Sequence, residues 1–341
     1  MFNIDLFFFI FFRIYVKTFN PLSTKYVMPK IRFLCHDNPR PSGGIRTLYR
    51  HVDMLCSAGF DAAIIHGNPE FRLQWFEHNT PVEPLHRNFS PDDWIVFPED
   101  YIYMMELFRD VDCKKVVFCQ NHFYIFEALP YKVSWQDFGI DHVLGSSKEI
   151  QKYIYQVFGL SADLIPYCIN HDIFMPSDKP RELIVSYMPR KGQVHLKQMI
   201  QSMWFQYPQL RDIQWVEIDG YTEPEVANIL QRSAVFVSTV YREGFGLPPI
   251  EAMACGALVV GFTAGGGRDF ATQSNGFWVP DEQSIELSNT LARVLLKYKT
   301  NPQDPKLTKV RNEGYKTAQK YNKGRTNEML LQAWKKLLNG M

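Results

Sequence analysis

Two glutamates, Glu243 and Glu251, lie between two apolar runs that are typical of buried strands, residues 235–239 and 257–262. The glycines of the intervening EGFGLPP segment permit unusual backbone angles close to a ligand, and its prolines suit a helix start. We expect Glu251 in the first helical turn, where the macrodipole favours an anion, and both carboxylates at the carboxyl end of the first strand. In the purely structural alternative, Glu251 only complements the helix dipole and Glu243 is a solvated loop charge.

Gly43 and Gly44, in the segment SGGI, separate a first predicted strand from a first predicted helix. Glycines at this position let backbone N–H groups and the helix N-terminus approach a phosphate or a sugar. A plain tight turn is equally compatible with the pattern.

Two further loops carry groups suited to a phosphorylated ligand. Arg190 and Lys191, in MPRKG, follow a predicted strand and offer positive charge to a diphosphate, although an exposed basic turn has the same composition. The loop TAGGGRD, which contains Gly266, is rich in N–H donors and follows the strand at 257–262.

The elements that would position these loops alternate between short apolar runs and helical periodicity, which predicts parallel sheets in an α/β fold. Ser147 suits the N-cap and Gly159 the end of one helix, and Thr222 with Glu225 forms a capping box for another. The predicted strands are 31–35, 61–66, 94–98, 114–120, 141–147, 162–167, 183–187, 213–218, 234–239 and 257–262.

A segment rich in proline and charge interrupts this alternation at about residues 172–182, and we interpret it as a domain linker. The predicted domains are 28–175 and 176–322, followed by a helix at 323–341. Two such domains face each other across a cleft, which is the expected ligand site.

Composition excludes several classes of protein. Lys and Arg number 37 against 36 Asp and Glu, so the basic excess of a nucleic-acid-binding protein is missing. The six cysteines include no CxxC pair, which argues against zinc and favours free thiols in a reducing cytoplasm.

Residues 1–27 are interpreted separately, because the first strand begins near Lys30. The apolar run LFFFIFF is shorter than the about 20 residues that span a bilayer, and no signal-peptide pattern surrounds it. A weak peripheral membrane anchor and a start codon assigned too far upstream remain equal alternatives.

With these motifs, the chain resembles the GT4-type retaining glycosyltransferases, whose E-x7-E signature is similar to EGFGLPPIEAMACG. SGGIRT resembles their N-terminal glycine loop, MPRKG their diphosphate-binding turn, and residues 164–174 and 275–295 also match family segments. The resemblance implies the GT-B fold: two Rossmann-like parallel-sheet domains across a cleft, with the nucleotide sugar mostly on the C-terminal one. The first domain would then bind the acceptor, and the last helix would cross back to it.

The resemblance also assigns roles to residues. Glu251 would hold the ribose hydroxyls, Glu243 would contact the donor sugar near its reacting end, and Lys191 would neutralise the leaving diphosphate. His122 falls where the family often has a histidine beside the donor sugar, although a strand-end histidine with only a structural role fits equally well. The remaining candidate nucleotide-sugar-binding residues are Gly43, Gly44, Gly244, Phe245, Gly246, Leu247 and Gly266.

The chain departs from the family at Ser186, where an arginine is common five positions before the lysine. Arg190 is the candidate replacement. No acidic pair stands in a suitable loop for a metal, so we expect neither a metal nor another cofactor. No nucleophile is evident, which favours a same-face reaction in which the leaving phosphate oxygen helps to deprotonate the acceptor hydroxyl.

The predicted activity is therefore retaining transfer of a sugar from a nucleotide-diphosphate sugar to a glycan, polysaccharide or lipid-linked acceptor. A nucleotide-sugar-binding protein without turnover is the alternative. An NAD-dependent dehydrogenase would need a G-x-G-x-x-G segment, which PSGGIRTLY does not supply. We expect a cytoplasmic protein that contacts the membrane at most peripherally and binds no nucleic acid.

Overall fold

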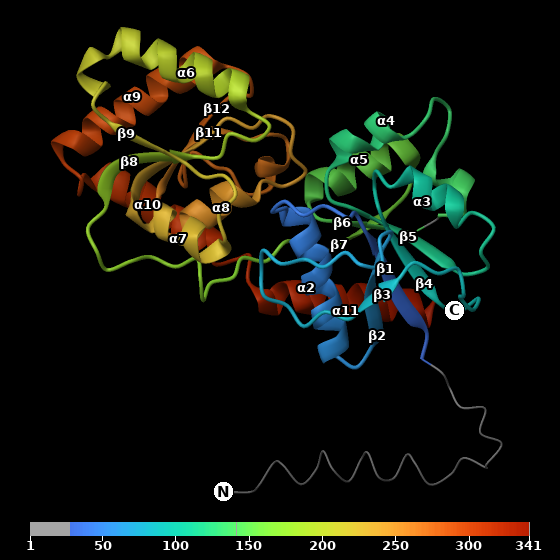
Figure 1. Ribbon diagram of the computed structural model, residues 1–341. Helices are drawn as coiled ribbons and strands as arrows, with labels where there is room; N and C mark the ends of the chain where they lie inside the picture. Colours follow the sequence, from blue (N-terminus) through green and yellow to red (C-terminus); the bar gives the residue numbers. More distant parts are fainter. Residues whose placement is uncertain (1–27, 141, 341) are drawn as a thin grey trace, which may run out of the picture.

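The computed structural model describes residues 28–140 and 142–340. The predicted N-terminal extension, residues 1–27, lies outside the described residues. Two separate parallel sheets, each covered by helices, form the two halves of the molecule (Figure 1). The prediction of a two-domain α/β fold with parallel sheets is confirmed.

The first sheet has seven strands in the order β3-β2-β1-β4-β5-β6-β7. Its strands are β1 Lys30–Cys35, β2 Asp61–His66, β3 Val82–Pro84, β4 Trp94–Pro98, β5 Lys114–Cys119, β6 His142–Gly145 and β7 Ala162–Leu164. The strands at the centre are apolar and buried on both faces, as the continuous apolar runs predict. The edge strand β3 escaped prediction because it is short, ends in a proline and is only partly buried.

The second sheet has five strands in the order β12-β11-β10-β8-β9. Its strands are β8 Glu182–Tyr187, β9 Gln214–Glu217, β10 Ser233–Ser238, β11 Leu258–Phe262 and β12 Phe277–Val279. The central strand β10 is buried along its whole length. The edge strand β12 was not predicted, since its three residues are too few to show a periodicity.

Helices cover both faces of each sheet (Figure 1). The first half contains α2 Gly43–Ser57, α3 Ile102–Leu107, α4 Ile125–Ala128 and α5 Lys148–Phe158, and the second contains α6 Gln193–Gln206, α7 Glu223–Arg232, α8 Leu247–Ala254, α9 Ser284–Thr300 and α10 Pro305–Ala318. The last helix, α11 Lys323–Asn339, packs against the first half. Short 3₁₀ turns lie at His122–Tyr124, Trp135–Phe138, Pro208–Leu210 and Gly266–Asp269.

The predicted helix ends are confirmed. The Ser147 hydroxyl accepts a hydrogen bond from the Ile150 N–H at 3.1 Å, and Gly159 ends α5 in the left-handed region. The Glu225 carboxylate accepts a hydrogen bond from the Thr222 N–H at 2.8 Å, as a capping box requires.

The segment between β7 and β8, residues 165–181, contains no helix or strand, and the predicted linker at about residues 172–182 covers its second half and the first residue of β8. The exact domain boundaries remain predictions. The last helix, α11, returns to the first domain, where Trp334 packs with ring centroids 6.1 Å from Phe33 and 5.8 Å from Trp94 (Figure 1). This return of the C-terminal helix agrees with the sequence-based expectation.

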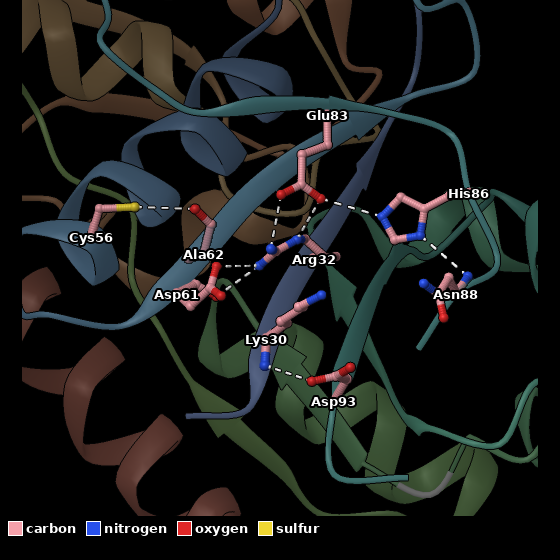
Figure 2. Close-up of polar contacts among 9 residues, drawn as sticks. All are labelled: Lys30, Arg32, Cys56, Asp61, Ala62, Glu83, His86, Asn88 and Asp93. Carbon is pink, nitrogen blue, oxygen red and sulfur yellow. Dashed lines mark hydrogen bonds and ion pairs between the residues drawn. The ribbon is translucent and has the colours of Figure 1, made fainter. Parts of the chain in front are cut away.

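The buried side chain of Arg32 connects β1 to the edge strand β3 of the first sheet (Figure 2). From β1, the Arg32 guanidinium makes two hydrogen bonds to Glu83 of β3, each 2.8 Å long, and an ion pair of 2.9 Å with Asp61 of β2. Burial of Glu83 would raise its pKa, but the Arg32 partner outweighs this effect and holds the pKa below its usual value. The short edge strand β3 is thus held by charge as well as by backbone pairing.

Within residues 28–140 and 142–340, no helix combines the length and the apolar character needed to cross a lipid bilayer.

Candidate functional site

The loop between β10 and α8 carries Glu243 to the junction of the two domains. The Glu243 N–H donates to the Ala264 carbonyl and its own carbonyl accepts from the Gly266 N–H, each at 2.9 Å. These bonds join the first candidate loop to the TAGGGRD loop after β11. The backbone at Glu243 is therefore held from two sides, and its side chain remains 24% exposed.

The Glu243 carboxylate forms an ion pair with Lys191, whose Nζ lies 2.9 Å from Oε1. The same Nζ lies 4.8 Å from the centre of the Tyr124 ring, which the first domain supplies. Burial alone would lower the pKa of Lys191, but the neighbouring Glu243 charge outweighs it, and the pKa is raised. Lys191 is thus a fixed, charged group between the domains.

Lys191 also has a left-handed backbone, with φ 67°. Non-glycine residues rarely adopt this conformation, and such strain concentrates at functional sites. It turns the chain between β8 and α6, so that Lys191 is half-buried while its neighbour Arg190 is exposed. Among the described residues, Arg190 makes no hydrogen bond or ion pair.

Ser186, at the position where the resembled family commonly has an arginine, is completely buried in β8. Its hydroxyl has no hydrogen-bond partner within the described residues. Arg190 as the replacement for that arginine stays a prediction. Lys191 is the basic residue of this turn that contacts the candidate site.

The backbone of Gly244 lies directly against the first domain. Its carbonyl accepts a hydrogen bond of 2.7 Å from the Ser147 hydroxyl at the start of α5. A methyl group on Gly244 would lie 2.0 Å from the Gln120 carbonyl oxygen, and one on Gly266 would lie 2.1 Å from the Gly244 carbonyl oxygen. Only glycine permits three backbones to cross here.

Helix α8 begins earlier than the sequence suggested. Gly246 precedes it with φ 94°, Leu247 is its first residue, and the two prolines occupy the next two positions, where no intrahelical N–H bond is lost. Glu251 is therefore in the second turn, and the expectation of a first-turn carboxylate held by the macrodipole was wrong. Its charge is balanced by a side chain of the other domain instead.

That side chain is Arg46 of α2. Its Nη2 donates to Glu251 at 2.7 Å and its Nη1 to Glu223 at 2.6 Å, while Arg50 also donates to Glu223 at 2.9 Å. All four side chains are largely buried. Sequence reasoning missed this network; the spacing of Arg46 and Arg50, four residues apart on one helix face, was the available signal.

The glycine pair after β1 contacts both domains. A methyl group on Gly43 would lie 2.7 Å from the Leu247 side chain, and the Gly44 carbonyl accepts a hydrogen bond of 3.2 Å from the Gln120 side chain. The N-terminus of α2 thus meets the N-terminus of α8, next to the Arg46–Glu251 contact.

His122 lies in a 3₁₀ turn of the first domain, directly after the residues that contact Gly244. Its ring is buried between Phe123 and Tyr153, at centroid distances of 4.2 and 4.7 Å. Burial lowers the pKa of His122, and its Nδ1 has no hydrogen-bond partner among the described residues. The lowered pKa favours the neutral ring.

A buried carboxylate that sequence reasoning missed, Glu99, holds this turn. It accepts backbone hydrogen bonds from Gln120 at 3.0 Å and Asn121 at 2.7 Å. Burial, with a smaller contribution from the neighbouring Asp100 charge, raises the pKa of Glu99 to about 8. Nothing in the local sequence distinguishes Glu99 from a solvated acid.

Phe245 points into the core of the second domain, against Tyr167, Phe270 and Tyr321 at centroid distances of 5.1, 5.3 and 5.0 Å. With Glu243 it also lines a cavity of about 30 Å³ beside α8. This volume suffices for about one water molecule. Phe245 therefore shapes the wall behind the loop.

The structure groups the candidate residues in two places. Glu243, Lys191, Gly244 and Gly266 lie together at the loop junction, and Glu251, Gly43 and Leu247 meet where α2 faces α8. Arg190 joins neither group. Across residues 28–140 and 142–340, no cluster of three or more His, Cys, Asp or Glu side chains is suited to a metal ion.

The model of the family "Glycosyl transferases group 1" matches residues 213–317, which include both glutamates. An alpha-1,6-glucosyltransferase of Actinobacillus pleuropneumoniae serotype 7 (strain AP76) is 29% identical over 244 residues, covering 68% of this chain and 72% of the relative.

Solved structures share the fold at low sequence identity. Sucrose-phosphate synthase from Thermosynechococcus elongatus superposes with a TM-score of 0.69 at 15% identity, covering 92% of this chain and all of the other. HepE of Anabaena, crystallised with UDP-glucose, gives a TM-score of 0.65 at 16% identity, covering 90% and 99% of the two chains. These similarities establish a GT-B fold.

Proposed function

We propose that the chain is a retaining, metal-independent member of the group 1 glycosyl transferases, whose family model matches residues 213–317. The reaction moves a sugar from a nucleotide-diphosphate sugar to a hydroxyl of a glycan, polysaccharide or lipid-linked acceptor.

The Lys191–Glu243 pair is the observation that carries the proposal. A cation and a carboxylate 2.9 Å apart at the domain junction suit a reaction that separates charge. Lys191 neutralises the diphosphate as the bond from the anomeric carbon to the phosphate oxygen breaks. Glu243 stabilises the positive charge that develops on the sugar.

The new bond forms between the acceptor oxygen and the anomeric carbon, on the face that the diphosphate leaves. The acceptor proton passes to the departing phosphate oxygen, so no protein nucleophile and no metal is required. N–H groups of the loop around Gly266 contribute further to binding the diphosphate. We assign His122 to the donor-sugar end of the site, as the resemblance to the family implies.

In the nucleotide half of the site, Glu251 accepts hydrogen bonds from the ribose hydroxyls. Both domains bring backbone close to the donor: the second domain at residues 244–247, and the first at Gly43 and Gly44. Arg190 adds positive charge at the solvent side of the diphosphate without a fixed contact of its own.

A hexose donor such as UDP-glucose fits the relatives, because one of them is named as a glucosyltransferase and HepE was crystallised with UDP-glucose. We further propose a cytoplasmic location, since the six cysteines are free thiols, with peripheral membrane contact when the acceptor is lipid-linked.

The experiment is incubation of the full chain with UDP-, GDP- and ADP-glucose and other nucleotide sugars, together with a panel of glycan and lipid-linked acceptors. Release of nucleoside diphosphate measures turnover, and NMR of the product gives the anomeric configuration. We expect turnover and a product of unchanged configuration. An inverted product would refute retention. Tight nucleotide-sugar binding without turnover would instead favour the alternative, a binding protein of the same fold.

A further inference from the structure

Arg46 stands out because it belongs to the first domain while both of its partners belong to the second. Its guanidinium forks between Glu223, the first residue of α7, and Glu251 in the second turn of α8. The side chain of Arg46 is 10% exposed and that of Glu251 only 6%. One buried cation thus joins three helices across the domain junction.

Because its carboxylate is buried, Glu251 depends on the contact with Arg46 to balance its charge. A carboxylate removed from water is costly unless a cation or hydrogen-bond donors compensate it, and the loss of one partner leaves the other charge uncompensated. Arg46 is the cation within hydrogen-bond distance of Glu251 among the described residues. Arg50, one turn further along α2, reaches Glu223 but makes no hydrogen bond to Glu251.

The geometry leaves half of the Glu251 carboxylate available. Arg46 donates to Oε1, and within the described residues Oε2 accepts no hydrogen bond. A carboxylate whose first oxygen is held by an arginine has a fixed orientation, and its second oxygen can accept from a hydroxyl group.

We propose that Arg46 is a positioning residue for the nucleotide: it orients and charge-balances Glu251 for the ribose hydroxyls, and thereby couples ribose recognition to domain closure. This inference rests on the proposed function. The coupling follows because Arg46 balances the charge of Glu251 only when the first domain is packed against the second. Since the ribose would bind Glu251, nucleotide affinity should differ between the closed and open arrangements of the domains.

The neighbouring contacts support the closed arrangement. Gly43, three residues before Arg46, packs its backbone against Leu247 of α8, and the Ser147 hydroxyl donates to the Gly244 carbonyl. These contacts bring the N-termini of α2 and α8 together, so the Arg46 side chain lies in a packed interface between the two helices.

The first test is the nucleotide affinity of full-chain variants, measured by calorimetry with UDP, GDP and ADP. We expect Arg46→Gln to weaken the nucleotide that binds best by about tenfold or more, as expected when a charge-assisted contact is lost. Arg46→Lys, which keeps the charge without the fork, should give an intermediate loss and serves if the glutamine variant does not fold. Arg50→Gln is the matched control from the same network and should change affinity by less than about threefold. Equal effects of the Arg46 and Arg50 changes would overturn the proposal.

The deciding measurement removes the ribose hydroxyls from the ligand as well. With the 2′,3′-dideoxy form of the same nucleoside diphosphate, wild-type protein should lose about tenfold or more in affinity, and the Arg46 variants about threefold or less. A general structural defect would not produce this difference. Equal losses in wild type and variants would overturn the role of Arg46 and leave the proposed function standing. Failure of the wild-type protein to bind any of the three nucleotides would overturn both.

Discussion

The replacement Gly244→Ala tests whether the close approach of the domains is needed for activity. The added methyl group would lie 2.0 Å from the Gln120 carbonyl oxygen and 2.8 Å from the Asn121 Cα. Both are backbone atoms, and Glu99 anchors both N–H groups, so the Gln120 loop cannot move aside as a flexible side chain would.

The size of the displacement follows from ordinary contact distances. Carbon and carbonyl oxygen approach to roughly 3.3 Å, so the two backbones must separate by about 1.3 Å. A separation of that size breaks the 2.7 Å hydrogen bond from Ser147 to the Gly244 carbonyl and shifts Glu243, the preceding residue. A misplacement of about 1 Å at a reacting centre costs on the order of 100-fold in rate.

We therefore expect kcat of the Gly244→Ala enzyme to fall about 100-fold. The assay is release of nucleoside diphosphate from the nucleotide sugar that the wild-type enzyme uses, with X-ray scattering to follow domain closure. Gly324→Ala in α11 is the control, because its methyl group would meet only a side-chain oxygen, at 3.3 Å. A folded Gly244→Ala protein with wild-type kcat and wild-type compactness would refute the reasoning.

Three further predictions follow from the site and the fold. Glu243→Gln should lower kcat by about 100-fold with little change in donor affinity, because the lost charge acts mainly in the transition state; steady-state kinetics in which kcat stays within about twofold would assign Glu243 a loop role only. Activity should persist in excess EDTA, and loss of turnover that added Mg²⁺ restores would contradict a metal-independent reaction. The lowered pKa of Glu83 means that its ion pair with Arg32 stabilises the fold fully above about pH 4.3, the unfolded value, and less as pH falls through the lower folded value. Acid unfolding of Glu83→Gln should therefore depend less on pH over this range than that of wild type, and parallel curves would show that the pair contributes nothing.

Much of the fold was predictable because its signals are local. Apolar runs such as residues 61–66 specify buried strands wherever they occur, and Ser147 and Gly159 terminate a helix through hydrogen bonds and backbone angles within a few residues. The glycine-rich segment around Gly244 likewise predicted the loop between β10 and α8, since glycine there has a conformational reason.

The start of α8 shows where local reasoning failed. A proline pair suits the first turn of a helix at more than one position, and the left-handed Gly246 set the start at Leu247. One residue of offset at this end moved Glu251 away from the dipole, and its buried charge required a cation that the nearby sequence does not contain.

The cations came from distant segments. Lys191 pairs with Glu243 across 52 residues, and Arg46 with Glu251 across 205. Sequence alone determined which segments become strands, helices and glycine loops, because those choices depend on neighbours a few positions away. Only the tertiary structure, within the second domain for Lys191 and between the domains for Arg46, decided which charges meet, because the energy of an ion pair depends on distance and burial, and neither is encoded in the spacing along the chain.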